Sequence, residues 1–500
     1  MMEQSRSGKA FLVAIGRSSN IVIAIALSAI LSRIISDKEV YGAFQQILLL
    51  YSLLSIIFQA GLPQSVFYFL PRYEGSERKA FILQNLGLLF IQGTLMGLSL
   101  YFLRFWLGKI LKSPHLPELL QVFALYPVFM LPTLCLEGIL MIYGQVRNFM
   151  LFSILTRALT FGSVVLPLLT GFLLQEAMFF WVASAVIALL IALKMTLTPV
   201  WRQKIKWHLE MLTAEVRYSL PLAGSAVMAC IIYYTDRVAV SNLLGVAQYA
   251  VYSNGAVEPP LVAIIVGAVQ TVLMAEFSLK VEQGQHQQVL EIWHRAVFKT
   301  AMLLLPFWGF LFPWAREVVV FLFSSRFEAS APIFSIYVWL VPAKIVAFIT
   351  IFIPWGASAA ALQVNLVSAA LAVIVIPLLT KFLGMQGAAL GYVLVYWIIF
   401  GYGTVKAARI MNVRVRDFCP WAKIAIIMTA ALLIGFLSKG IGGLWQFDNY
   451  FAVREIGLLC HLALGGLIFS LLYLVFLEVM QYFSVINYGL GLLSRVRAPA

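Results

Sequence analysis

The feature that most constrains this chain is a series of apolar segments, each about as long as a membrane-spanning helix. A helix needs about 20 apolar residues to cross the hydrocarbon core of a bilayer. Hydrophobic residues make up 62% of the 500 residues and charged residues only 11%. We therefore predict an all-α polytopic membrane protein without a soluble catalytic domain. The fourteen segments that meet the length requirement are 11–32, 42–62, 80–103, 119–143, 150–173, 178–197, 218–243, 247–275, 297–315, 331–353, 361–380, 387–405, 422–438 and 456–478.

The basic residues between these segments predict the orientation of the chain. Lys and Arg gather in cytoplasmic loops. If the N-terminus lies inside, the inner segments hold about twice as many Lys and Arg as the outer loops. Both termini are then cytoplasmic, which requires an even number of helices. Arg6 and Lys9 precede a first apolar segment that continues to Leu31, so we interpret it as an uncleaved helix and not as a signal peptide.

Two basic connections divide the chain into groups of six, six and two helices. The first, 201–217, carries Trp201, Ile205 and Leu209 at helical spacing, which predicts an amphipathic helix on the cytoplasmic surface, with an ordinary basic loop as the alternative. The second connection is 406–423. Internal repeats of this kind are typical of transporters, which hold substrate at the repeat interface. The predicted parts are a six-helix lobe with its cytoplasmic linker (1–217), a second, pseudo-symmetric six-helix lobe (218–420), and a terminal helix pair with a cytoplasmic tail (421–500).

Glycine and proline interrupt several of the predicted helices. Pro63 follows Gly61 in the second segment, and Pro259-Pro260 follow Glu258 in the eighth. Proline removes a backbone hydrogen bond, and inside a membrane such a break is tolerated where a cavity or a neighbouring helix satisfies the freed carbonyls. Glycines four residues apart instead indicate close packing of two helices. The pairs with this spacing are Gly93/Gly97 and Gly387/Gly391.

Charged residues inside the apolar segments are the main indication of function. A charge at the bilayer centre costs about 2.5–3.5 kcal/mol even on insertion scales, so such residues usually face a bundle interior or a water-filled cavity. Lys344 and Glu258 lie near the middle of their segments. Cations outnumber acids in this group, which predicts a net-cationic cavity. Its members are Arg17, Glu137, Arg157, Asp236, Arg237, Glu258 and Lys344.

We expect these charges to have different roles. The predicted substrate-binding residues are Arg17, Asp236, Arg237 and Lys344, and Glu258 is the predicted proton- or cation-coupling residue because it lies on a proline-broken helix. The alternatives are a structural ion pair for Asp236 and Arg237, a merely buried Glu258, and an Arg17 side chain that snorkels to the lipid headgroups. Snorkelling is the favoured interpretation for Arg157, and an interfacial position explains Glu137.

The sequence lacks the common catalytic motifs. It contains no Walker A loop, no HExxH motif, no nucleophile elbow and no His/Cys cluster with metal-ligand spacing. Its four cysteines form no CxxC motif, so we interpret them as small buried apolar residues. We therefore expect a protein that is not an enzyme and that holds no metal or organic cofactor. Uphill transport would then draw on a proton or sodium gradient, or on consumption of the product.

Two segments carry a resemblance to a known family. One begins GKAFLVAIGRSSNIVIAIALSAILSRIISDKEVYGAF, and the other is YSLPLAGSAVMACIIYYTDRVAVSNLLGVAQYAVYSNG. Both resemble the first and seventh helices of bacterial O-antigen and exopolysaccharide flippases, within the multidrug/oligosaccharidyl-lipid/polysaccharide exporter superfamily. The motifs are an Arg early in helix one and a Thr-Asp-Arg late in helix seven. The chain departs from the pattern in the turn PWGASAA, at 354–360, which has no basic residue for phosphate capture.

The resemblance implies export of undecaprenyl-diphosphate-linked oligosaccharides by alternating access, for polysaccharide biosynthesis. It implies a central cationic cavity lined by helices one, two, seven and eight, in a protein of the bacterial inner membrane. The expected partners are membrane lipid, the lipid-linked oligosaccharide and other polysaccharide assembly proteins, with no nucleic acid, and the expected state is a monomer. One alternative is a MATE-like cation-coupled multidrug exporter, which should prefer an acidic cavity. A second is a membrane-embedded polysaccharide polymerase, which should show a large outer loop or an acidic catalytic site.

Overall fold

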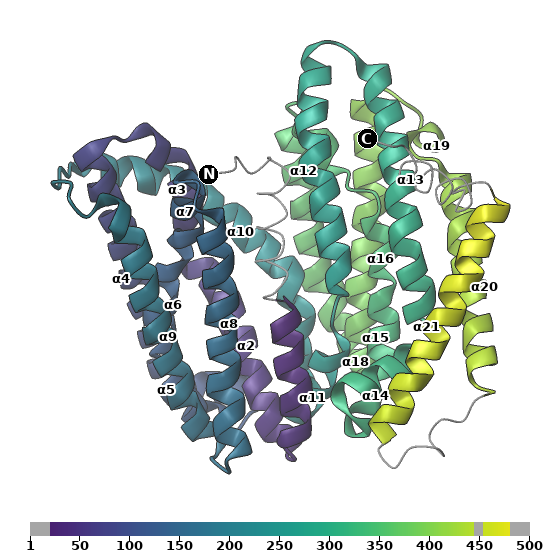
Figure 1. Ribbon diagram of the computed structural model, residues 1–500, viewed down its shortest axis with the longest axis horizontal. Coiled ribbons are helices and arrows are strands. Elements are labelled where there is room, and N and C mark those ends of the chain that lie inside the picture. The colour runs from purple at the N-terminus through teal and green to yellow at the C-terminus, as the bar shows by residue number, and fades with distance from the viewer. Residues whose placement is uncertain (1–20, 445–453, 481–500) are drawn as a thin grey trace, which may run out of the picture. The chain divides into compact units, whose positions relative to one another are not determined.

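A computed structural model describes residues 21–444 and 454–480, and every element labelled in Figure 1 is a helix. Eleven helices in these residues are long and apolar enough to cross a membrane, or up to twelve if one bent pair forms a single span. The predicted all-α polytopic class is confirmed. The predicted number of fourteen spans is not confirmed.

The difference in number has a structural origin. The segments predicted at 361–380 and 387–405 lie in one helical run, α18 (Ser358–Ile410), which contains a non-helical residue at Gly384 with φ 62°. Gly387 and Gly391 lie just beyond it. A Cβ on Gly387 would lie 2.0 Å from the Leu379 carbonyl oxygen, so the two arms of α18 fold tightly onto each other at this glycine. The first predicted segment extends into 1–20, outside the described residues, and its described part is a shorter apolar helix, Ile21–Ile34.

The chain divides into two compact units. The first comprises residues 1–254 and 365–395, and the second comprises 255–364 and 396–500. The helices of the first unit are α2 (Lys38–Phe58), α3 (Leu62–Phe69), η1 (Leu70–Arg72), α4 (Gly75–Ile110), α5 (Leu116–Phe123), α6 (Tyr126–Met130), η2 (Leu131–Cys135), α7 (Leu136–Ile142), α8 (Val146–Leu169), α9 (Leu174–Leu197), η3 (Thr198–Val200), α10 (Leu209–Leu244) and most of α11 (Val246–Gly255), with the middle of α18.

The second unit contains the remaining helices. They are α12 (Pro260–Glu282), α13 (His286–Leu311), α14 (Ala315–Phe323), η4 (Ser325–Ser330), α15 (Ala331–Val338), α16 (Leu340–Lys344), α17 (Ile349–Phe352), α19 (Val415–Phe418), α20 (Trp421–Gly442) and α21 (Arg454–Val479), with both ends of α18. Within this unit α20 packs against α13 and α21, which lie beside it in Figure 1. The predicted division at 217 and 420 stays a prediction.

Close helix packing explains the glycine pair in α4. A Cβ on Gly93 would lie 2.6 Å from the Pro127 carbonyl oxygen, and one on Gly97 would lie 2.3 Å from that of Ala124. Real Cβ atoms essentially never come this close, so both positions need glycine for α4 to reach the α5–α6 segment. The packing role predicted for this pair is confirmed.

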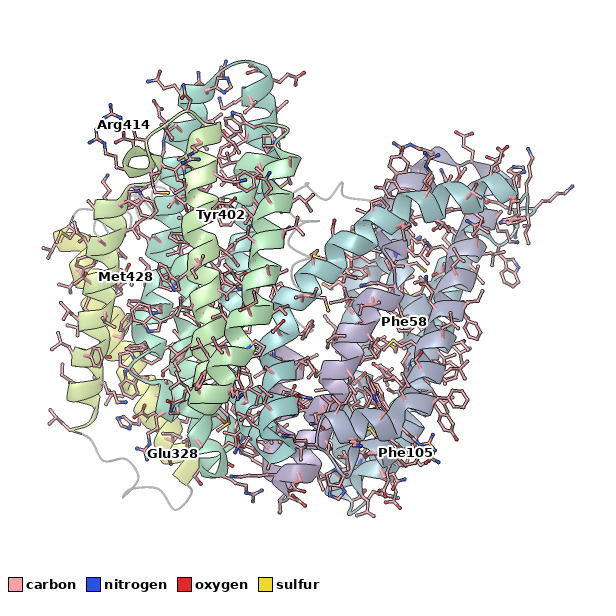
Figure 2. The ribbon with its side chains drawn as sticks, turned by 180° about the vertical axis from the view of Figure 1, so that it is seen from behind. Phe58, Phe105, Glu328, Tyr402, Arg414 and Met428 are labelled. Carbon is pink, nitrogen blue, oxygen red and sulfur yellow. The ribbon has the colours of Figure 1, made fainter. Side chains whose placement is uncertain are left out.

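Large apolar side chains cover the outward faces of the helices, as expected for a protein solvated by lipid. Phe102, Phe105 and Trp106 near the end of α4 are exposed, and Phe105 is labelled in Figure 2. In a soluble protein an apolar surface of this kind would mark an interface. Lipid tails are as apolar as these side chains, so in a bilayer such exposure is the normal state of a spanning helix.

The prediction of a separate amphipathic helix at 201–217 is wrong. Residues 201–208 are irregular, and Leu209 begins α10, which continues to Leu244. The irregular part is instead tied to the start of α4. Lys79 Nζ donates to the carbonyl oxygens of Trp201 and Gln203, at 3.0 and 2.9 Å. These hydrogen bonds from a side chain replace the helical ones, because backbone carbonyls of an irregular segment need other donors.

Candidate functional site

Lys344 and Glu258 form an ion pair inside the second unit. The Lys344 ammonium donates to the Glu258 carboxylate, and it also lies 5.1 Å from the centre of the Tyr396 ring. Their side chains are 15% and 26% exposed, respectively. The sequence pointed to both residues separately, one as a substrate-binding cation and the other as an ion-coupling acid. The structure brings them together and leaves both within reach of a solute.

Each member of this pair lies at an interruption of its helix. Glu258 belongs to a non-helical stretch, 256–259, just before α12 begins at Pro260. Lys344 is the last residue of α16, and residues 345–348 are irregular before α17 begins. A helix N-terminus favours negative charge, so the start of α12 stabilises the Glu258 carboxylate. Non-helical backbone at membrane depth is tolerated only inside protein or at a water-filled cavity, and transporters use such breaks to hold substrates and ions.

Asp236 and Arg237 lie on α10 in the first unit and have different surroundings. Asp236 is fully buried and accepts a hydrogen bond from the Tyr252 hydroxyl at 2.7 Å. Arg237 is half-buried, and its guanidinium lies 5.7 Å from the centre of the Tyr234 ring. Their assignment as substrate-binding residues stays a prediction. The geometry gives Asp236 a hydrogen-bond partner, Tyr252, within its own unit.

A polar network continues from this region through α2 and α11. The Tyr41 hydroxyl donates to Asn254 Oδ1 at 2.5 Å and accepts from Gln45 Nε2 at 2.7 Å. One residue further along α2, the Gln46 amide donates to the Ser241 hydroxyl at 2.8 Å. Buried hydrogen bonds that join different helices favour one packing arrangement of those helices.

Sequence reasoning missed a buried carboxylate at the start of α10. Glu215 is fully buried, and its carboxylate accepts from Ser65 Oγ at 2.7 Å, Asn85 Nδ2 at 2.6 Å and Gln84 Nε2 at 2.7 Å. The side-chain oxygen of Gln84, Oε1, in turn accepts a hydrogen bond from Trp207 Nε1. Because 201–217 was interpreted as a surface helix, Glu215 was counted with its basic neighbours. The available signal was the apolar segment, 218–243, which starts only three residues later.

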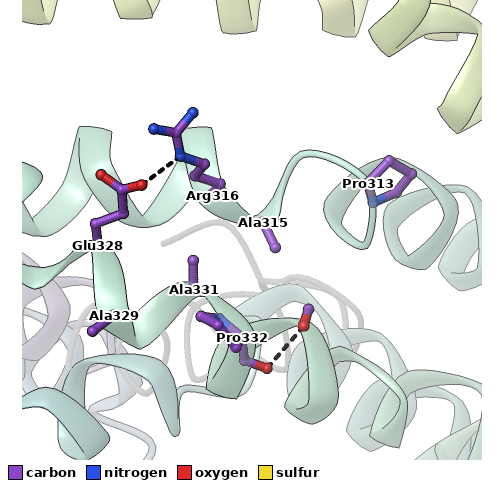
Figure 3. Close-up of a pocket in the computed structure, with 8 residues that line it drawn as sticks. Pro313, Ala315, Arg316, Glu328, Ala329, Ala331 and Pro332 are labelled. Carbon is purple, nitrogen blue, oxygen red and sulfur yellow. Dashed lines mark hydrogen bonds and ion pairs between the residues drawn. The ribbon is translucent and has the colours of Figure 1, made fainter.

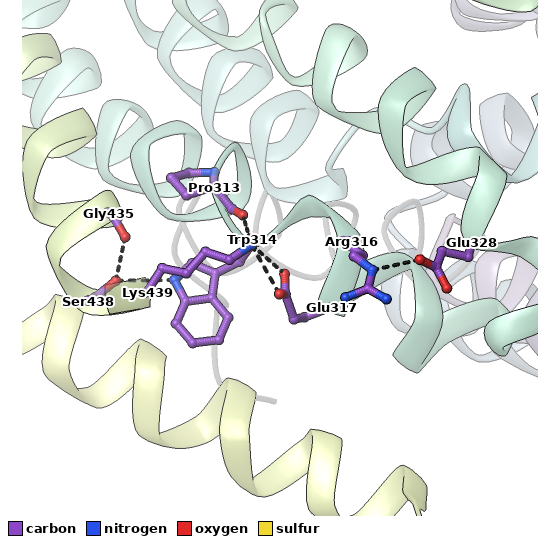
Figure 4. A network of polar contacts seen from close by, with 8 residues as sticks. All are labelled: Pro313, Trp314, Arg316, Glu317, Glu328, Gly435, Ser438 and Lys439. Atoms are coloured by element: carbon purple, nitrogen blue, oxygen red, sulfur yellow. Dashed lines mark hydrogen bonds and ion pairs between the residues drawn. The ribbon is translucent and has the colours of Figure 1, made fainter. Parts of the chain in front are cut away.

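Lys439 contacts a sharp bend between two helices of the second unit. The helices α13 and α14 meet at 77° around Pro313, and Lys439 Nζ donates to the Pro313 carbonyl oxygen at 2.6 Å. The same ammonium lies 3.0 Å from a Glu317 carboxylate oxygen, and Trp314 Nε1 donates to Ser438 Oγ at 3.1 Å (Figure 4). The bend frees backbone carbonyls, and α20 supplies the donor that one of them needs. We call these contacts the bend clamp.

Two hollows accompany these clusters. One, of about 600 Å³, lies beside the bend in the second unit, where Arg316 Nε donates to Glu328 at 2.7 Å (Figure 3). The other, of about 380 Å³, lies in the first unit between α2, α10 and α18 and has mostly apolar walls, with Tyr234 and Asn242 among them. Neither contains Lys344 or Glu258.

The remaining predicted charges are less informative. Arg17 lies outside the described residues. Arg157 and Glu137 are half-buried, on α8 and α7. Within 21–444 and 454–480, no group of three or more His, Cys, Asp or Glu side chains is placed to hold a metal ion.

The fold matches those of known membrane transporters. The structure titled lipid II flippase MurJ, in an inward closed conformation, aligns with a TM-score of 0.70 and 13% identity, covering 94% of this chain and 99% of that one. An inward-facing MATE multidrug resistance transporter aligns at 0.61 and 15%, covering 79% and 96%. A superfamily transporter from Pyrococcus furiosus, titled for the reverse polarity of its binding pocket, aligns at 0.55 and 14%, covering 80% and 94%. These likenesses show the fold.

The family follows from the sequence itself. No curated protein sequence matches the chain. A family model described as "Polysaccharide biosynthesis protein" matches residues 30–332, which is more than half of the chain. The match includes α2 to α14 and therefore Glu258, Asp236 and Arg237. The chain belongs to the polysaccharide biosynthesis protein family.

Proposed function

We propose that this protein is a flippase that moves an undecaprenyl-diphosphate-linked oligosaccharide across the bacterial inner membrane by alternating access. Membership in the polysaccharide biosynthesis family and the MurJ-like fold support a lipid-linked glycan as substrate. The observation that carries the proposal is the Lys344–Glu258 pair at two helix breaks of an apolar bundle. The protein performs no bond chemistry in this scheme, acts as a monomer, and keeps both termini in the cytoplasm.

Lys344 recognises the diphosphate in this proposal. An ammonium is a compact point charge with three donors and is a common phosphate ligand. Diphosphate carries more negative charge than one carboxylate, so it competes with Glu258 for Lys344. Tyr396, whose ring faces the ammonium, offers an aromatic surface on which a sugar can stack.

Glu258 supplies the link to an ion gradient. When the diphosphate engages Lys344, the carboxylate loses its partner in a region of low dielectric, where an uncompensated charge is costly. It then takes up a proton or another cation. Release of the glycan restores the original pair, so one ion moves with each cycle. Arg17, Asp236 and Arg237 are the other residues that we propose to bind the substrate.

The rival function is cation-coupled drug export, which the MATE likenesses favour. Purified protein in vesicles separates the two. We expect flipping of a fluorescent undecaprenyl-diphosphate oligosaccharide and no accumulation of an organic cation such as ethidium. Ethidium transport without glycan flipping would overturn the proposal in favour of the exporter. The matched control is vesicles that contain the Lys344→Met variant.

A further inference from the structure

The Glu215 cluster of the first unit contains more acceptors than donors. Ser65 has one hydroxyl proton but two oxygens within 2.8 Å, the Leu62 carbonyl and a Glu215 carboxylate oxygen. The Asn85 amide has two protons but three oxygens within 3.3 Å, those of Leu62, Ser65 and Glu215. Oxygens at contact distance without a proton between them repel each other. The cluster therefore needs one more positive group.

Two further buried oxygens in the cluster lack a partner. Asn85 Oδ1 belongs to the same amide that contacts Glu215, and Asn85 is fully buried. Ser219 Oγ lies one helical turn after Glu215 on α10, and Ser219 is 3% exposed. Residues four apart share a helix face, so the Ser219 hydroxyl lies on the same side as the carboxylate. Leaving a buried polar group unpaired is unfavourable.

No cation of the described residues pairs with Glu215. The groups that donate hydrogen bonds to its carboxylate are a neutral hydroxyl and two neutral side-chain amides. The pKa of the nearby Tyr73 hydroxyl is raised. Burial is the largest cause, and the negative charges of Glu215 and Glu77 add to it. A buried carboxylate without a counterion is unfavourable, which again indicates a missing positive charge.

We propose that the Glu215 cluster binds one small monovalent cation, with sodium as the ion that its chemistry fits. The available ligands are all hard oxygens: the Glu215 carboxylate, the hydroxyls of Ser65 and Ser219, the Leu62 carbonyl, and Asn85 Oδ1 after the amide turns over. Hard cations prefer such oxygen sets. A single carboxylate balances a single positive charge, so a divalent ion would leave net charge in the apolar interior.

The backbone of this region is built for close approach. Gly61 has φ 75° and is the residue just before α3. A Cβ there would lie 2.9 Å from the Ser219 carbonyl oxygen. The left-handed turn brings Leu62 and Ser65 against α10 without a side chain between them. A bound ion would thus join α3, α4 and α10 at the point where α10 begins.

The test is direct binding of ²²Na⁺ to purified protein in detergent at constant pH, with choline as the replacement salt. We expect about one saturable site per chain and its loss in Glu215→Gln. Ser219→Ala removes only one buried hydroxyl, so it should fold normally and weaken binding about tenfold. The matched control is Ser184→Ala, a buried serine of α9 that bonds only within its own helix, and it should bind as the wild type.

Two outcomes would overturn this proposal. One is undiminished binding in both Glu215→Gln and Ser219→Ala. The other is loss of binding in Glu258→Gln with full binding in Glu215→Gln, which would place the ion at the second-unit pair. No glycan is present in this experiment, so its failure is separate from failure of the proposed flippase function.

Discussion

Two carboxylates, one in each unit, have opposite surroundings. Glu258 in the second unit is partly exposed and already has a cation, Lys344. Glu215 in the first unit is fully buried and has only neutral donors. An ion pair that a solute can reach can exchange one partner for another, whereas an enclosed carboxylate needs a small ion that fits between its ligands. We therefore assign anion recognition to the Lys344–Glu258 pair and cation binding to the Glu215 cluster.

The largest expected effect tests the ion pair. Lys344→Met removes the ammonium and keeps the length of the side chain, so it should reduce glycan flipping about tenfold to a hundredfold. The basis is the loss of charge-assisted hydrogen bonds, each contributing about 1.5–3 kcal/mol. Flipping rates in reconstituted vesicles measure the effect. If Lys344→Met flips glycan at the wild-type rate, Lys344 does not recognise the substrate.

A stability measurement sharpens the contrast between the clusters. Glu215→Ala leaves the buried donors of Ser65 and Asn85 without their acceptor, and it should lower the free energy of unfolding by about 3 kcal/mol. Glu258→Ala should cost less, because water reaches the lysine left behind. Denaturant titrations in detergent compare the two. Equal losses would mean that the difference in burial does not govern the two sites.

A third charged cluster, the bend clamp, is expected to serve stability alone. Lys439→Met removes the donor to the Pro313 carbonyl and the partner of Glu317. We expect a loss of about 1–2 kcal/mol in the free energy of unfolding, with little change in flipping rate once protein amounts are matched. Ser438→Ala removes the hydroxyl that accepts from Trp314 and donates to the Gly435 carbonyl oxygen, and it should cost less. A flipping rate reduced as far as in Lys344→Met would show that the terminal helix pair takes part in transport.

The smallest effect concerns a cysteine that reports on folding. Cys419 is buried in the connection before α20, and burial raises the pKa of its thiol to about 12. The thiolate is the reactive form, so Cys419 should react with maleimide far more slowly at pH 8 than the cysteine introduced by Lys204→Cys at an exposed position. Slow labelling should persist in Lys344→Met. Rapid labelling in that variant would attribute its transport defect to unfolding of the second unit.

Much of the fold was predictable because hydropathy reports directly on bilayer crossing. The positions of thirteen of the predicted segments fall on described helices, and the fourteenth, the first, is described only in part. Helix ends were harder to predict. The predicted apolar segment starts at residue 218, whereas α10 begins at Leu209. Helices continue beyond the bilayer when their polar ends find partners. The non-helical residue Gly384 lies between the segments predicted at 361–380 and 387–405, but the helical structure of α18 continues closer to it on both sides than the predicted ends.

The site was predictable residue by residue but not in its pairings. Lys344 and Glu258 stood out because charges are rare at membrane depth, yet 86 residues separate them, and nothing in either segment indicates the other. Glu215 was missed for the opposite reason. It stands among polar neighbours in sequence, and only the close approach of α3 and α4 buries it. Burial of this kind depends on tertiary packing.

The most direct test of the central claim uses the neutral double variant Lys344→Met/Glu258→Gln. Removing both charges leaves no unpaired ion, so the protein should fold with a stability close to the wild type. If Lys344 recognises the diphosphate, this variant should still flip undecaprenyl-diphosphate oligosaccharide at least about tenfold more slowly than the wild type in vesicles. Wild-type flipping by the stable double variant would contradict the account, because Lys344 would then serve only to neutralise Glu258.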